Sequence, residues 1–217
     1  MTNRLTRPFL AGCAMLLSSC VGTSVKQTWK SPDYTGGPVG PVAVLTVEER
    51  GLIRVGLENR VARELERTGQ PVVLTHEVLS LREIREDKQA AATRLRQAGA
   101  QTVLITRLIT SEMQARSFRA GDERYAPVTT GFSPGLGYGP YDWYGYYTVA
   151  FQDMSTVWSS QSKRVYLESG LFDLGSGQRL WSCLTDTLLK ESTDRVAEMD
   201  QLADTIVSAL RKDGLVR

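Results

Sequence analysis

Residues 131–135 (GFSPG) fit the G-x-S-x-G pattern that exposes a nucleophilic serine in many hydrolases. In that chemistry the residue after the serine donates its backbone N–H to the oxyanion, but Pro134 has no N–H to donate. The catalytic histidine should also follow the serine in the chain, whereas the single histidine, His76, precedes it. We therefore expect no acyl transfer at Ser133 and no enzymatic activity.

The single histidine is the second candidate for chemistry. His76 is followed by Glu77, and imidazole and carboxylate groups are common zinc ligands and proton carriers. A catalytic zinc ion normally takes three protein ligands, and the chain has no second histidine. We expect His76 to lie at a strand end, in the loop to the next helix. The glycine run over residues 135–139 lacks the Lys-Ser/Thr pair of a phosphate loop, so the sequence predicts neither a metal nor a cofactor.

The amino-terminal residues predict a secretory signal that ends at a cysteine. A basic start with Arg4 and Arg7 leads into an apolar stretch over residues 8–19, and Cys20 follows. That stretch is shorter than the roughly 20 residues that cross a bilayer core, so it can direct export but cannot anchor the mature chain. Residues 1–19 are therefore predicted to be a signal peptide that is removed.

Residues 17–20 (LSSC) resemble the lipobox of bacterial lipoproteins. The resemblance implies that the Cys20 thiol carries diacylglycerol and that the new amine is acylated, for example by palmitate. Cys13 ends a similar box, but it would leave too few apolar residues after Arg7 for an export segment. Val21, which is not aspartate, resembles the sorting signal for the outer membrane. We expect a protein lipid-anchored to the outer membrane and facing the periplasm.

Cys183 is then the one thiol left in the mature chain, so no internal disulfide can form. It lies in a strand-like run, and no histidine or neighbouring charge suggests a lowered pKa. We expect Cys183 to be a small packed hydrophobe and not a nucleophile.

Length and charge restrict the remaining function classes. With 217 residues and 41% hydrophobic content, the chain fits one domain with a sizeable core. Its 26 basic and 24 acidic residues become equal in number once Arg4 and Arg7 leave with the signal. We expect no nucleic-acid partner, because the mature chain has no net positive field.

Two successive strand–helix units are predicted in the first half of the mature chain. Each begins with a short apolar run typical of a buried strand and ends its helix at a glycine, Gly69 or Gly99. Such a repeat implies parallel strands with helical crossovers. The predicted strands are 42–47, 71–74 and 102–109, and the second helix is 86–98.

Both helices are predicted to be amphipathic. In the first, charged residues that include Arg54 and Glu58 are expected to form a solvated face. Its predicted inward residues are Ile53, Leu57, Val61 and Leu65. Those of the second helix are Ala91, Leu95 and Ala98.

A β-hairpin over residues 165–174 and 180–189 follows, and a last helix is capped by Asp194 and ended by Gly214. The apolar stripe of that helix is Val196, Met199, Ala203, Ile206, Val207 and Leu210. The sequence thus predicts a single α/β domain over residues 41–217. Its mixed β-sheet has a βαβαβ core, followed by the hairpin and the C-terminal helix.

Residues 117–154 interrupt this pattern with a long aromatic insertion, rich in glycine and proline, before the hairpin. Tyrosine and tryptophan give large contact areas with a polar group, while glycine and proline keep the segment out of a sheet, as in recognition loops. A surface loop without a partner is the alternative. The expected partner-binding residues are Tyr138, Tyr141, Trp143, Tyr144, Tyr146 and Tyr147.

Residues 20–40 are poor in periodicity and are predicted to be a lipidated tether. Segments 29–33 (WKSPD), 99–107, 167–173 (LESGLFD), 180–182 and 210–215 (LRKDGL) resemble an uncharacterised family of Gram-negative lipoproteins. The resemblance implies a small α/β domain distantly similar to the amino-terminal domain of TolB and to curli-secretion and penicillin-binding-protein activator lipoproteins. It brings no catalytic residues.

We therefore expect a non-enzymatic, lipid-anchored binding or assembly protein of the bacterial cell envelope. The anchor would be the diacylglycerol and acyl chains at Cys20, and the partner an envelope protein or peptidoglycan. Two alternatives remain open, namely a structural subunit of an envelope export or assembly complex and a cell-wall-acting enzyme.

Overall fold

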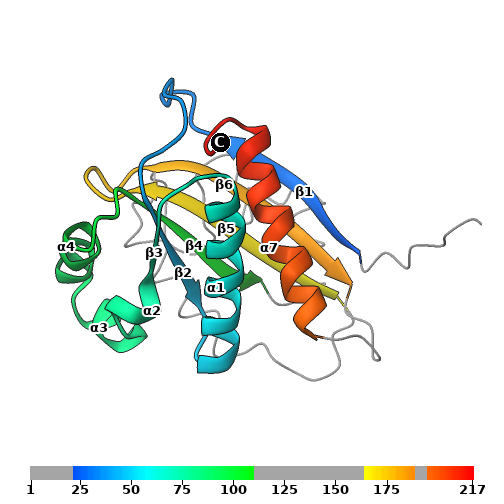
Figure 1. Ribbon diagram of the computed structural model, residues 1–217, viewed down its shortest axis with the longest axis horizontal. Helices are drawn as coiled ribbons and strands as arrows, with labels where there is room; N and C mark the ends of the chain where they lie inside the picture. Colours follow the sequence, from blue (N-terminus) through cyan, green and yellow to red (C-terminus); the bar gives the residue numbers. More distant parts are fainter. Residues whose placement is uncertain (1–21, 110–163, 189–194) are drawn as a thin grey trace, which may run out of the picture.

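The computed structural model describes residues 22–109, 164–188 and 195–217 (Figure 1). Among these residues, no helix is both long enough and apolar enough to cross a membrane. In chain order the elements are β1 (Thr23–Lys30), β2 (Val42–Val47), α1 (Gly51–Arg67), β3 (Val72–Leu74), α2 (Thr75–Val78), α3 (Leu81–Glu86), α4 (Lys88–Gln97), β4 (Thr102–Ile109), β5 (Arg164–Asp173), β6 (Arg179–Leu188) and α7 (Arg195–Lys212).

The strands form one mixed six-stranded sheet in the order β1-β6-β5-β4-β2-β3. β2 lies parallel to both β3 and β4, and the remaining neighbours are antiparallel. The predicted α/β domain with a βαβαβ core, a hairpin and a C-terminal helix is confirmed.

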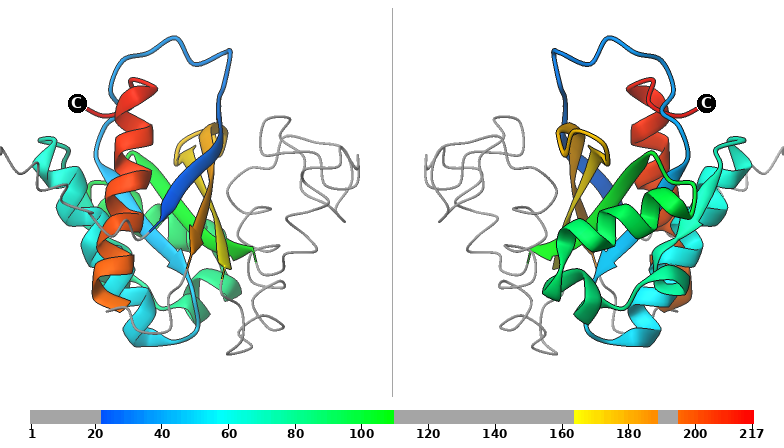
Figure 2. Two further views of the ribbon diagram at one scale, coloured as in Figure 1. Left: turned by 90° about the vertical axis from the view of Figure 1, so that its right-hand side faces the viewer. Right: turned by 90° about the vertical axis from the view of Figure 1, so that its left-hand side faces the viewer.

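The sheet separates two apolar cores. α1 and α7 pack side by side over one face (Figure 2), where Val42 and Val44 of β2 join their buried side chains. Ala43 and Leu45 point to the other face and pack with residues of α4. Because successive residues of a strand face opposite sides, a strand covered on both sides reads as a continuous apolar run, as predicted for residues 42–47.

Glycines end the helices as predicted. Gly69, Gly99 and Gly214 have positive φ values of 78°, 97° and 74°. A residue with a Cβ is strained in this left-handed conformation, so glycine is favoured just beyond a helix.

The predicted tether is wrong for residues 23–30, because β1 belongs to the sheet. It pairs antiparallel with β6, with an irregularity in register between Val25 and Gln27. β1 is an edge strand with one neighbour, so most of its side chains stay at least partly exposed. Its mostly polar residues, TSVKQTWK, therefore lacked the apolar signal used to find the other strands.

The second predicted helix, residues 86–98, corresponds to α4 (Lys88–Gln97), and Glu86 instead ends the separate short helix α3. Asp87 between them is extended (φ −145°, ψ 97°), and its side chain caps α4 by accepting a hydrogen bond from Ala90 N. Ala98, predicted to point inward, is exposed, and Ala92 is buried instead. α4 ends at Gln97, so Ala98 is its C-cap and lies beyond the buried stripe.

In α7 the predicted stripe is buried at Ala203, Ile206, Val207 and Leu210. Val196, in the first turn, is 49% exposed, so the stripe does not reach the start of the helix. Asp194, its predicted cap, lies outside the described residues.

One end of the sheet gathers most of the features discussed below, and we call it the carboxyl end because the parallel strands β2, β3 and β4 finish there. Antiparallel pairing places the start of β5, the finish of β6 and the start of β1 at the same end. Figure 1 shows β2, β4 and β6 pointing toward this end. Ile109 and Arg164, which flank the segment that contains the aromatic insertion, also lie there.

Candidate functional site

Most of the residues predicted to act lie outside the described residues. These are Cys20, the pattern at 131–135 and the six aromatic residues Tyr138, Tyr141, Trp143, Tyr144, Tyr146 and Tyr147. Cys183 is described, and it is fully buried in the core beneath α7. Burial, with a smaller effect of Asp213, raises the pKa of its thiol to about 12. The thiol therefore stays protonated at neutral pH, which confirms the prediction that it is a packed hydrophobe.

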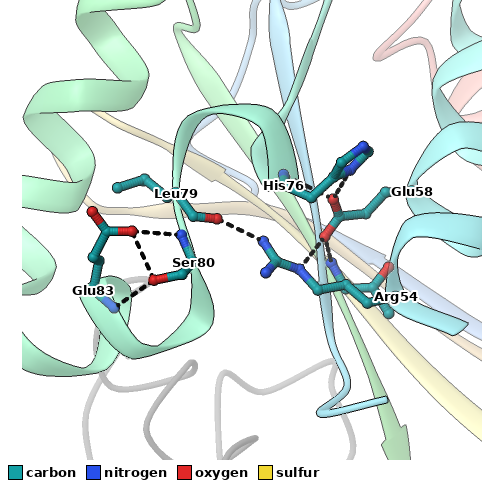
Figure 3. Close-up of polar contacts among 7 residues, drawn as sticks. Arg54, Glu58, His76, Leu79, Ser80 and Glu83 are labelled. Atoms are coloured by element: carbon teal, nitrogen blue, oxygen red, sulfur yellow. Dashed lines mark hydrogen bonds and ion pairs between the residues drawn. The ribbon is translucent and has the colours of Figure 1, made fainter. Parts of the chain in front are cut away.

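His76 lies in the short helix α2, directly after β3, and not in a loop. Its partner is not the adjacent Glu77, which is exposed, but Glu58 of α1. The distance between His76 Nδ1 and Glu58 Oε2 is 2.6 Å. The structure thus brings together Arg54, Glu58 and His76, which we call the Glu58 cluster (Figure 3).

The expected solvated face of the first helix is wrong at Arg54 and Glu58. The Glu58 side chain is fully buried, and that of Arg54 is 9% exposed. Burying a carboxylate is unfavourable unless charge and hydrogen bonds compensate it. The spacing of four residues places the guanidinium beside the carboxylate, with Arg54 Nε donating to Glu58 Oε1 at 2.9 Å.

Glu58 uses both of its oxygens fully. Oε1 also accepts from the backbone N–H of Thr46 in β2 at 2.9 Å. Oε2 accepts from the backbone N–H of His76 at 3.1 Å and contacts the imidazole. A carboxylate has about four lone-pair positions, so these four contacts leave none for a substrate. Through these contacts, the Glu58 side chain connects α1 to β2 and α2.

Arg54 extends the cluster toward α3. Its Nη2 donates to the backbone carbonyl of Leu79 at 3.1 Å, just before α3 begins (Figure 3). Ser80 and Glu83 then form a capping box, in which Ser80 Oγ accepts from Glu83 N at 3.2 Å and Glu83 Oε2 accepts from Ser80 N at 2.8 Å. The Ser80 hydroxyl also donates to Glu83 Oε2 at 2.7 Å. This hydrogen bond, followed by the one from Ser80 N and by Arg94, lowers the pKa of Glu83 to about 2.

The chemistry available to the Glu58 cluster is narrow. A buried carboxylate accepts hydrogen bonds, so it favours the tautomer in which the proton of His76 sits on Nδ1. The His76 side chain is 16% exposed, so the cluster is nearly closed to solvent. Within the described part of the chain, no group of three or more acidic, histidine or cysteine side chains is placed to hold a metal ion.

A second buried ion pair joins β4 to β5 at the carboxyl end. Arg107 Nε donates to Glu168 Oε2 at 2.7 Å, and both side chains are about 5% exposed or less. On the opposite face, the hydroxyl oxygens of Thr106 and Ser169 lie 3.0 Å apart. Charged residues at directly opposed strand positions hold the register where the chain leaves β4 and returns in β5.

Sequence reasoning missed Glu58, Arg54 and the Arg107–Glu168 pair. In the sequence, only the four-residue spacing of Arg54 and Glu58 indicated an ion pair, and the same spacing is found in ion pairs on the solvent-exposed face of a helix. What distinguishes the buried pair is the backbone N–H of Thr46 and of His76, and these donors approach only when the chain folds.

Comparison with protein-family models gives no match, and comparison with curated proteins gives none either. Among solved structures, the chain is similar to the PelC dodecamer from Paraburkholderia phytofirmans, with a TM-score of 0.43 and 14% identity over 87% of this chain and 97% of that one. It is also similar to the lipoprotein GNA1162 from Neisseria meningitidis, with a TM-score of 0.40 and 14% identity over 80% of this chain and 97% of that one. These likenesses are too low to support an argument about function.

Proposed function

We propose that this chain is a non-enzymatic binding or assembly protein of the bacterial cell envelope, attached through lipid on Cys20 to the outer membrane and facing the periplasm. The observation that carries the proposal is the amino-terminal pattern, a basic start and a short apolar segment that ends in the lipobox-like residues 17–20. The folded domain begins almost at once after it, because β1 starts at Thr23.

The buried charged side chains are already paired within the protein, and this supports a non-enzymatic role. A catalytic carboxylate needs a free oxygen within hydrogen-bond reach of its substrate. Both oxygens of Glu58 are occupied by protein donors, and Arg107 pairs with Glu168 inside the sheet. These groups serve to hold elements together.

The aromatic insertion is the proposed binding segment. Its tyrosines and Trp143 belong to the residue types that dominate the binding energy of protein interfaces. The chain departs for it from Ile109 and returns at Arg164, two residues on neighbouring strands. A partner bound by this segment would be an envelope protein or peptidoglycan.

Crosslinking in intact cells, followed by mass spectrometry, tests this role. Wild type, Trp143→Ala and the matched control Trp158→Ala, which lies outside residues 117–154, should be compared at equal expression. Loss of a central aromatic anchor commonly costs about 2 kcal/mol of affinity or more, so Trp143→Ala should lose most of the crosslinked partner and the control should keep it. An unchanged set of partners would contradict the binding role, and turnover of cell-wall polymers by the purified protein would contradict the non-enzymatic one.

A further inference from the structure

We infer that the carboxyl end of the sheet lies against the lipid headgroups of the membrane that holds the anchor. The inference rests on the proposed lipidation of Cys20. Thr23, the first residue of β1, is at this end, since it pairs with Thr187 near the finish of β6. Three residue steps from Cys20 to Thr23 can span at most about 11 Å. The anchor therefore cannot hold this end far from the bilayer surface.

Exposed apolar side chains mark the same end. In the described ranges, the large hydrophobic residues classed as exposed are Val25, Leu52 and Val196, at 41%, 92% and 49%. Val25 lies near the start of β1, Leu52 in the first turn of α1 and Val196 in the first turn of α7. Single exposed hydrophobic residues are ordinary, but here all three gather at the end where the lipid would emerge.

The helices confirm which end these residues occupy. α1 begins directly after β2 finishes, so its first turn lies at the carboxyl end. α7 runs beside α1, with Arg60 Nε 2.8 Å from Asp200 Oδ1, and Figure 1 shows both helices starting at this end. Leu52 and Val196 therefore belong to one surface.

The opposite end of the sheet exposes polar side chains. It contains the end of α1 with Glu66 and Arg67, the hairpin turn with Ser176, and the C-terminal Arg217, all exposed and polar. The end next to the anchor exposes apolar side chains among charged ones such as Glu49 and Arg50, whereas the described residues expose no large apolar side chain at the far end. This difference matches a domain that rests on a bilayer and presents its far end to the aqueous periplasm. A second copy of the chain is the other possible cover for the apolar end, and the test below separates it from the membrane.

Depth-dependent quenching on lipidated protein tests the orientation. A fluorescent label is attached at Leu52→Cys or, as the matched control on the same helix, at Glu66→Cys. Both positions are exposed, so neither change should disturb folding, and Cys183 is buried and will not take the label. The two positions are about 21 Å apart along α1. The protein is bound to vesicles of phosphatidylethanolamine and phosphatidylglycerol that carry a nitroxide at headgroup depth.

We expect several-fold stronger quenching at position 52 than at position 66. Equal quenching, or stronger quenching at position 66, from protein that floats with the vesicles would overturn the orientation and leave the proposed anchoring intact. Absence of quenching at both positions in floating protein would overturn it too and would favour a second copy as the cover. Wild-type protein that does not float with the vesicles would instead overturn the proposed anchoring, and the orientation with it.

Discussion

Thr23 and Thr187 pair at the carboxyl end of the sheet, with their hydroxyl oxygens 3.0 Å apart. This contact joins the first residue of β1 to the strand that precedes α7. From Thr23 on, three residues after the proposed lipid attachment site, the chain is thus part of the sheet. A domain held this closely has a restricted orientation on its membrane, whereas a long tether would allow many.

The Glu58 cluster should be important for stability. Removing one partner of a buried ion pair leaves the other charge uncompensated, so Glu58→Ala should lower the free energy of unfolding by about 3 to 5 kcal/mol. Glu66→Ala, an exposed change on the same helix, should stay within about 0.5 kcal/mol of wild type. Urea unfolding of the non-lipidated domain measures both. A loss below about 1 kcal/mol for Glu58→Ala would mean that the cluster is solvated after all.

The capping box at α3 should make stability depend on acid. The folded pKa of Glu83 is lowered from 4.5 to about 2, so folding favours its charged form. Its stabilising contribution is therefore complete above about pH 4.5 and is lost as the pH falls toward 2. Ser80→Ala removes the largest cause of the shift and should cost about 1 kcal/mol at neutral pH. Between pH 6 and pH 2.5, the free energy of unfolding should decrease less for Ser80→Ala than for wild type. An equal decrease for the two proteins would contradict the role of the capping box in lowering the pKa of Glu83.

Cys183 should make the stability of the fold decrease as the pH rises above 9. Its folded pKa of about 12 lies above the ordinary value of 9.0, so folding favours the neutral thiol. This contribution is complete below about pH 9 and is lost as the pH rises from 9 toward 12, because the unfolded chain ionises first. The difference in stability between wild type and Cys183→Ala should therefore shrink from pH 8 to pH 10.5. A thiol reagent should modify wild type only as it unfolds, and rapid modification of the folded protein would refute the burial.

The elements that sequence predicted well are those whose signal is local. The apolar run Val42–Val47 and the glycines after α1, α4 and α7 each reflect a constraint on a few neighbouring residues. β1 was missed because an edge strand needs little apolar surface, and its pairing with β6 joins residues more than 150 positions apart. The burial of Glu58 was missed because its donors, on Thr46 and His76, become neighbours only through the fold.

Intact mass measurement of the mature protein extracted from membranes tests the central claim most directly. The proposed lipoprotein predicts a chain that begins at Cys20, with added mass for one diacylglycerol and one amide-linked acyl chain. Cys20→Ala should remain uncleaved and lack that added mass. Wild-type protein recovered from the soluble periplasm with an unmodified Cys20, or with an amino terminus elsewhere, would contradict the lipid anchor and the function built on it.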